Sequence, residues 1–170
     1  MILENDTIAL RPIDLDEVIF FFEMATDSYA TKFWYGEYTG EKVPDYDAFI
    51  QEWDDFYFVD DEPDMGRCFF IIAEGDIIGE INYSVIDTDD KSTELDILIA
   101  YEDMVDRGFG TAALRMISEY LFSELDVKKC WLAVPESNER AKKACEKAGF
   151  IKEHSFSSNN ILWDIMTLRT

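Results

Sequence analysis

Histidine and cysteine are scarce in this sequence, and no long hydrophobic run is present. His154 is the only histidine, so a histidine-rich metal site is excluded, and any Ser-His-Asp or Cys-His system would depend on it. Cys68, Cys130 and Cys145 are odd in number and widely spaced, without the closely paired ligands of metal sites. We therefore expect free thiols, a reducing cytoplasmic setting and no bound metal. No run approaches the ~20 apolar residues of a membrane span, and the first residues lack the basic start of a signal peptide.

Basic residues are also few. Lysine and arginine number 15 against 37 aspartates and glutamates, which gives a net charge of −22. The imbalance is greatest in residues 1–66, which hold 18 acidic and 3 basic residues. Because nucleic-acid binding depends on phosphate neutralisation by lysine and arginine, we expect no nucleic-acid partner. The acidic field favours cationic partners, and the alternative is that it serves solubility alone.

The chain is long enough for one domain with a sizeable core, and 48% of its residues are hydrophobic. Hydrophobic periodicity predicts, in order, one strand, two helices, three strands, a helix, a strand, a helix and two strands. We predict an α/β (α+β) fold with a single mixed, mostly antiparallel sheet of about seven strands and helices on both faces. No repeat or linker divides the chain, so residues 1–170 are expected to form a single domain.

The stretch from Glu94 to Leu114 combines a buried strand, a glycine loop and the start of a helix. Leu95 and residues 97–99 form a strand too apolar to be half exposed. Gly108 and Gly110 follow, and apolar residues then recur at helical spacing. Backbone N–H groups around such glycines, together with the positive end of a helix, suit a bound phosphate or pyrophosphate. The alternative is a turn in which the glycines serve geometry only.

A second stretch follows the next predicted strand. It reads Ser137-Asn138-Glu139-Arg140-Ala141 and continues as Ala144-Cys145-Glu146-Lys147-Ala148-Gly149-Phe150. Together the two stretches resemble the acetyl-CoA-dependent N-acetyltransferases of the GNAT superfamily. That family has a Gln/Arg-x-x-Gly-x-Gly/Ala loop and a helix of the form Asn-x-x-Ala-x-x-x-Tyr-Glu-x-x-Gly-Phe. Here Val105 replaces the Gln/Arg and Cys145 replaces the tyrosine, and the likeness covers nearly the whole chain.

The resemblance implies a single acetyltransferase domain with acetyl-CoA as co-substrate. It also implies that the strand at 95–100 splays from the strand at 128–134, so that the pantetheine arm lies in the gap and bonds to the backbone of Ile97 and Ile99. The implied cofactor-binding residues are Ile97, Leu98, Ile99, Val105, Arg107, Gly108, Phe109, Gly110, Thr111, Asn138 and Ala141.

Asp96 is the predicted catalytic base. Acetyl transfer to an amine needs a neutral amine, and an alkyl ammonium has a pKa near ~10, so a group must accept its proton. Asp96 interrupts an apolar strand, where a carboxylate is costly to bury, and burial raises its pKa. Strand alternation places Glu94 on the same face, where it assists. The alternative is a salt bridge between Asp96 and a neighbouring strand.

Within the superfamily, the chain is most similar to the aminoglycoside 6'-N-acetyltransferases, which act in antibiotic resistance. Leu95-Asp96-Ile97-Leu98-Ile99 matches their strand motif, and Trp34-Tyr35-Gly36-Glu37 matches an aromatic-aromatic-glycine-acid loop. The likeness implies that Asp96 deprotonates the amine and that the substrate is a small polycation. A further aspartate of that group is Ala133 here, and Glu136 is its possible substitute. The predicted substrate-binding residues are Trp34, Tyr35, Glu37, Glu94, Asp96 and Glu136.

Cys145 occupies the position of the tyrosine that protonates the leaving thiolate in the family. A thiol with its ordinary pKa of ~8.5 can donate that proton, and the alternative is a small core residue on an alanine-rich helix face. The sequence is compatible with three functions. They are a small-molecule N-acetyltransferase, a protein N-terminal or polyamine acetyltransferase, and a non-catalytic acyl-CoA-binding domain. We expect a monomer or homodimer.

Overall fold

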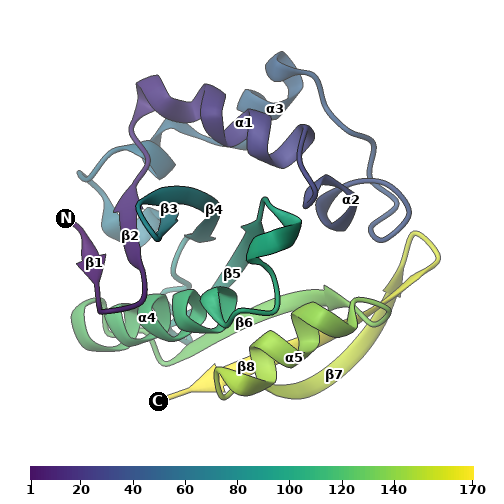
Figure 1. Ribbon diagram of the computed structural model, residues 1–170. Helices are drawn as coiled ribbons and strands as arrows, with labels where there is room; N and C mark the ends of the chain where they lie inside the picture. The colour runs from purple at the N-terminus through teal and green to yellow at the C-terminus, as the bar shows by residue number, and fades with distance from the viewer.

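An eight-stranded sheet runs through the molecule, as the computed structural model of residues 1–170 shows (Figure 1). The strands lie in the order β1-β2-β3-β4-β5-β6-β8-β7, and every neighbouring pair is antiparallel except β5 and β6. Their bounds are β1 Leu3–Glu4, β2 Ala9–Pro12, β3 Arg67–Ala73, β4 Asp76–Tyr83, β5 Ser92–Ile99, β6 Lys129–Pro135, β7 Ile151–Ser158 and β8 Ile161–Arg169. This confirms the predicted mixed sheet, with one strand more because two-residue β1 is too short to show an alternating pattern.

Helices cover both faces of the sheet, as predicted (Figure 1). Helices α1, α2 and α3 lie on one face, and α4 and α5 lie on the other. Their bounds are α1 Val18–Thr26, α2 Thr31–Trp34, α3 Tyr46–Glu52, α4 Phe109–Glu124 and α5 Glu139–Lys147, with short 3-10 turns at Leu15–Glu17, Asp55–Phe58, Pro63–Met65 and Glu102–Met104. No helix has the length and apolar character needed to traverse a bilayer.

Strand alternation divides the interior into two cores. On β3, Phe69 and Ile71 belong to a cluster of 23 buried residues that also includes side chains of α4 and α5. Cys68 and Phe70 face the other way, into a cluster of 12 buried residues beneath α1 and α3. Successive strand residues point to opposite faces, so a continuous apolar strand supplies both cores.

Helix α3 is short and ends at Glu52. Ile50 is 41% exposed, whereas its neighbour Phe49 is fully buried. A helix of two turns presents only a narrow stripe to the core, and here Phe49 fills it.

Strands β5 and β6 separate after a short paired stretch. They pair in parallel at Ser92–Lys129, Thr93–Cys130 and Glu94–Trp131, and beyond Glu94 no residue of β5 pairs with β6. From there β5 continues to pair with β4, and β6 pairs with β8 as far as Pro135. The predicted splay is therefore present, and it opens the centre of the sheet.

Candidate active site

The splay leaves a cavity of about 600 Å³. The loop before α4, the start of α4 and helix α5 form one end, while α2, the loop after it and the end of α3 form the other. The residues of our predicted site that line the cavity are Trp34, Tyr35, Glu94, Asp96, Ile97, Leu98, Ile99, Val105, Gly108, Phe109, Gly110, Thr111, Asn138, Ala141 and Cys145. The structure does not bring Glu37, Arg107 or Glu136 to its wall.

The glycine loop lies at one end of the cavity. Gly108 has φ +85°, and a Cβ placed there would meet nothing within 4 Å. Helix α4 begins at the next residue without a side-chain cap, so its first N–H groups remain free. A Cβ at Gly110 would meet only the Cδ1 of Ile97, at 4.0 Å. The open space and the free donors suit a phosphate group at the helix start.

The cations near the glycine loop differ from the one that the sequence indicated. Arg107 pairs with Glu74, in the β3–β4 turn, and its guanidinium lies 5.0 Å from the centre of the Phe109 ring. Arg140, Lys143 and Lys147 of α5 line the cavity instead. Their spacing of three and four residues places them on one face of α5, and that spacing was visible in the sequence.

Asn138 caps α5 at the cavity edge. Its side-chain oxygen accepts a hydrogen bond from the backbone N–H of Ala141 at 3.3 Å. This is the usual role of an asparagine before the first helical residue. Arg140 ties the start of α5 to the loop before α4 and to the segment between α1 and α2, because it donates to Asp106 at 3.1 Å and to the hydroxyl of Tyr29 at 2.5 Å.

The backbone of Ile97 is already engaged within the gap. Its carbonyl accepts a hydrogen bond from the indole N–H of Trp34 at 3.1 Å. Its N–H donates to Oδ1 of Asp96 at 2.9 Å. We expected these backbone groups to meet a pantetheine arm, so such a ligand would compete with Trp34 for the carbonyl.

Asp96 opens onto the cavity, although protein surrounds it at longer range. This desolvation raises the pKa of Asp96 to about 7, the negative charge of Glu94 adds to the rise, and the hydrogen bond from Ile97 opposes it. Burial raises the pKa of Glu94 as well. A carboxyl with a pKa near neutrality is suited to accept a proton at physiological pH.

A fully buried carboxyl lies near Asp96, on the neighbouring strand β4. Glu80 is fully buried on β4, and both of its side-chain oxygens accept from Asn82, at 2.9 and 3.2 Å. Asn82 in turn is the cross-strand partner of Asp96. Burial raises the pKa of Glu80 well above its usual range. Our sequence reasoning missed Glu80, although it interrupts an apolar strand just as Asp96 does.

Aromatic rings and two further carboxylates form the other end of the cavity. Glu41 and Glu52 line it, and the sequence reasoning identified neither. Glu41 lies in the loop after α2 and Glu52 at the end of α3, so only the folded chain shows that they face the same cavity. The rings that line this end are Phe33, Trp34, Tyr35, Trp53, Phe156 and Trp163.

Cys145 lines the cavity but is only 1% exposed. Burial, followed by the charge of Glu146, raises the pKa of its thiol to about 12. A thiol with that pKa is a weak acid, and the small face of α5 explains the residue as a packing group. Ala133 also lines the cavity, where it contributes no charge.

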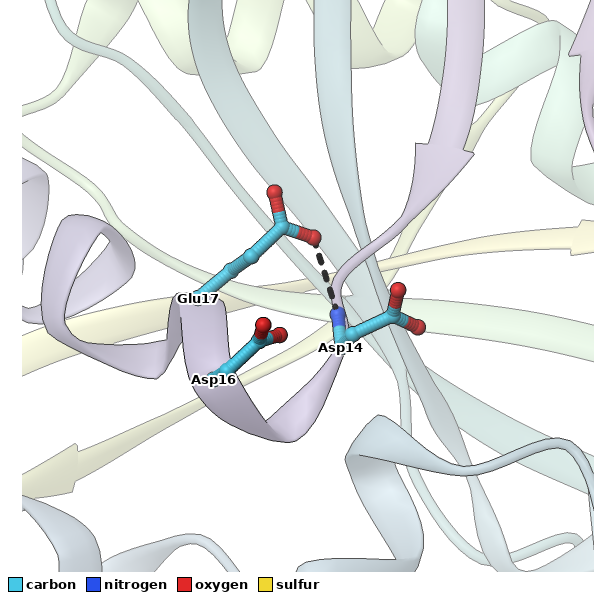
Figure 2. Close-up of side chains that lie close together, drawn as sticks. All are labelled: Asp14, Asp16 and Glu17. Atoms are coloured by element: carbon cyan, nitrogen blue, oxygen red, sulfur yellow. Dashed lines mark hydrogen bonds between the residues drawn. The ribbon is translucent and has the colours of Figure 1, made fainter.

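A compact acidic cluster lies outside the cavity, at Asp14, Asp16 and Glu17 (Figure 2). Glu17 accepts from the backbone N–H of Asp14 at 3.2 Å and pairs with Arg11 at 2.9 Å. Asp14 lies 3.7 Å from Arg67. Since two of the three carboxylates are engaged with arginines and the turn itself, we assign them a structural role at the start of α1.

A family model described as an acetyltransferase (GNAT) domain matches residues 7–151. The spermidine N(1)-acetyltransferase of Escherichia coli K12 is 25% identical over 157 residues, which cover 90% of this chain and 80% of that protein.

Solved structures share the fold. The aminoglycoside acetyltransferase AAC(6')-Ib, in complex with paromomycin and acetyl-CoA, has a TM-score of 0.75 and 22% identity, covering 96% of this chain and 94% of that one. The spermidine N-acetyltransferase of Vibrio cholerae, in complex with CoA and spermine, has a TM-score of 0.77 and 19% identity, covering 97% and 96%. A dodecameric structure of that Vibrio enzyme also matches, with a TM-score of 0.72.

Proposed function

Because the chain belongs to the GNAT acetyltransferase domain family, we propose that residues 1–170 form a single N-acetyltransferase domain acting on a small polycationic amine. One observation carries the proposal. A single cavity joins a glycine loop and helix start to Asp96, whose pKa is raised to about 7, and then to a wall of rings and carboxylates. The two ends suit an anionic acyl donor and a cationic acceptor respectively.

Acetyl-CoA would supply the acetyl thioester. Its pyrophosphate suits the free N–H groups after Gly108, and the cations Arg140, Lys143 and Lys147 lie on the same side of the cavity. Such a basic face matters here because the protein as a whole carries a net charge of −22.

Asp96 would hold the ammonium group of the acceptor and accept its proton. The amine then has a free lone pair for attack on the acyl carbon, and Glu94 strengthens the local attraction for a cation. Cys145 is poorly suited to return a proton to the departing thiolate because burial raises its pKa to about 12. We therefore assign that proton to solvent, which reaches the cavity.

Two acceptor classes fit this site. The matched relatives include a spermidine acetyltransferase and an aminoglycoside acetyltransferase, and both substrate types carry several ammonium groups. Aromatic faces and carboxylates bind such groups through cation–π and ion-pair contacts. An aminoglycoside acetylated at its 6'-amine would give the protein a role in antibiotic resistance. The three cysteines are free and buried, which suits the reducing cytoplasm that we propose as its location.

Thiol release from acetyl-CoA tests the proposal directly. The acceptors should include spermidine, spermine, kanamycin, a 6'-hydroxyl aminoglycoside and a short peptide with a free N-terminus. We expect turnover with a polyamine or a 6'-amino aminoglycoside and none with the 6'-hydroxyl analogue. Turnover confined to peptides would indicate protein N-terminal acetylation, and binding of acetyl-CoA without turnover would indicate a non-catalytic acyl-CoA-binding domain.

A further inference from the structure

Glu41 and Glu52 have no part in the proton transfer described above, although both line the cavity. Glu41 belongs to the loop after α2, and Glu52 is the last residue of α3. The loop is fixed locally, because the backbone N–H of Gly36 donates to the carbonyl of Glu41 at 2.6 Å. The hydroxyl of Thr39 accepts from the backbone N–H of Glu41 at 3.2 Å and donates to the carbonyl of Trp34.

Tyr35 lines the same cavity as these two carboxylates and Asp96. Its side chain lines the cavity and the residue is only 7% exposed, yet its hydroxyl makes no hydrogen bond within the protein. Burial raises the pKa of Tyr35 most, and the negative charges of Glu52, Asp96 and Glu41 raise it further, in that order. The hydroxyl is therefore within electrostatic reach of all three carboxylates and is free to meet a ligand.

No cation of the protein neutralises this group. None of the ion pairs in the structure includes Glu41, Glu52, Glu94 or Asp96. Burial, followed by the negative charge of Glu41, raises the pKa of Glu52. A carboxylate at the C-terminal end of a helix is also unfavourable for the helix dipole. These carboxylates therefore have no charged partner within the protein, and they suit an external cation.

We propose that Glu41, Glu52 and the Tyr35 hydroxyl form a second ammonium subsite, which binds the distal ammonium of a diamine or polyamine whose reacting amine lies at Asp96. This inference rests on the proposed function, since Asp96 defines the reacting end. The rings of Trp34 and Trp53, stacked at 6.4 Å and 18°, line the same region and can contact the carbon chain between two ammonium groups. Two-point recognition of this kind selects diamines over monoamines of equal length.

Calorimetry on the full chain tests the subsite without requiring turnover. The probes are 1,n-diaminoalkanes with three to eight methylenes and n-alkylamines of matching length. We expect the best diamine to bind wild type about 10- to 100-fold more tightly than its monoamine, the range of one charge-assisted hydrogen bond. Glu41→Gln/Glu52→Gln should remove most of this preference, and Tyr35→Phe should reduce it several-fold.

Asp47→Asn/Asp55→Asn is the matched control. It removes the same charge from exposed positions in α3 and in the turn after it, outside the cavity. The control should keep the diamine preference. Equal loss in the control and in the double glutamine variant would mean that only the general acidic field acts, and the subsite would be overturned. A wild type that binds diamines no better than monoamines would overturn it as well.

Thiol release separates the subsite from the proposed function. For wild type, the diamine preference should appear mainly as a lower KM, because the distal contact is uniform binding. If no amine supports thiol release, the proposed function fails, while the calorimetric preference still decides the subsite. If thiol release proceeds without any diamine preference in KM, the function stands and the subsite fails.

Discussion

The indole N–H of Trp34 donates a hydrogen bond to the carbonyl of Ile97 at 3.1 Å, and this bond joins the N-terminal helices to the splayed strand β5. Sixty-three positions separate the two residues in the chain. Trp34 also stacks on Trp53 and packs edge-on against Phe21, so its ring is fixed by the core beneath α1. The bond therefore engages a backbone carbonyl in the section of β5 that no longer pairs with β6.

Replacing Trp34 by phenylalanine should separate packing from hydrogen bonding at this point. The ring contacts remain in large part, whereas the loss of one hydrogen bond should cost about 0.5–1.5 kcal/mol in the free energy of unfolding. The free carbonyl of Ile97 is then available to a ligand donor, so acetyl-CoA should bind more tightly than to wild type. Denaturant unfolding and calorimetry measure the two effects. Weaker acetyl-CoA binding would show instead that the indole contacts the ligand.

Asp96→Asn should retain acetyl-CoA affinity and lower kcat by about 100- to 10,000-fold, because a general base is removed while shape and hydrogen bonding are kept. In wild type, kcat/KM should fall as the pH drops below about 7, where Asp96 becomes protonated. The residual activity of the variant should lack this limb. Full kcat in the variant would exclude Asp96 as the base.

The same carboxyl should also shape the pH dependence of stability. The pKa of Asp96 is raised from 3.8 to about 7 in the folded state, so the folded state retains a proton that the unfolded state has released. This contribution is fully present below pH ~4 and is lost as the pH rises through about 7. As the pH rises from ~4 to about 7, wild type should therefore lose stability relative to Asp96→Asn. Parallel curves for both proteins, measured by urea unfolding, would contradict the raised pKa.

Gly110→Ala tests the proposed pyrophosphate site at the start of α4 with the least disturbance of the fold. The position lies in α4 with an ordinary backbone, and a Cβ there meets only Ile97 Cδ1 at 4.0 Å, so folding should be unaffected or improved by up to ~1 kcal/mol. The added methyl lines the cavity where a pyrophosphate would approach the helix start, and acetyl-CoA affinity should fall about tenfold or more. Gly108 is a poorer choice, because its φ of +85° makes any side chain strained. Unchanged affinity in a folded Gly110→Ala protein would give the loop a purely structural role.

Gly79→Ala should damage the sheet itself. A Cβ at Gly79 would lie 2.1 Å from the carbonyl oxygen of Leu98 on the neighbouring strand, where backbone must shift to make room. We expect a loss of about 1–3 kcal/mol in the free energy of unfolding. Gly75→Ala serves as a comparison, since a Cβ there meets nothing within 4 Å and only the positive φ opposes it. A smaller loss at Gly79 than at Gly75 would argue against close approach of β4 and β5.

Local sequence determined several features of this protein by itself. The apolar strand at Leu95–Ile99, the two glycines and the following helical stripe predicted strand β5, the loop and α4, because these depend on side-chain periodicity and backbone freedom over short distances. Asp96 was identified for the same reason, since a carboxylate within an apolar strand is costly wherever the strand is packed. The family motifs and the acidic composition are likewise properties of the chain alone.

Only the tertiary structure decided which side chains share the cavity. Arg107 lies in the predicted loop, but Glu74 from a hairpin 33 positions away draws its guanidinium aside, and helix α5 supplies the cations instead. Glu41 and Glu52 entered the site because α3 and the loop after α2 pack over the splayed strand, whereas Glu37, four positions from Glu41, remains outside. Such convergence depends on packing between segments distant in sequence. Local periodicity specifies which face of an element is buried, but not which charged groups will face one another across the fold.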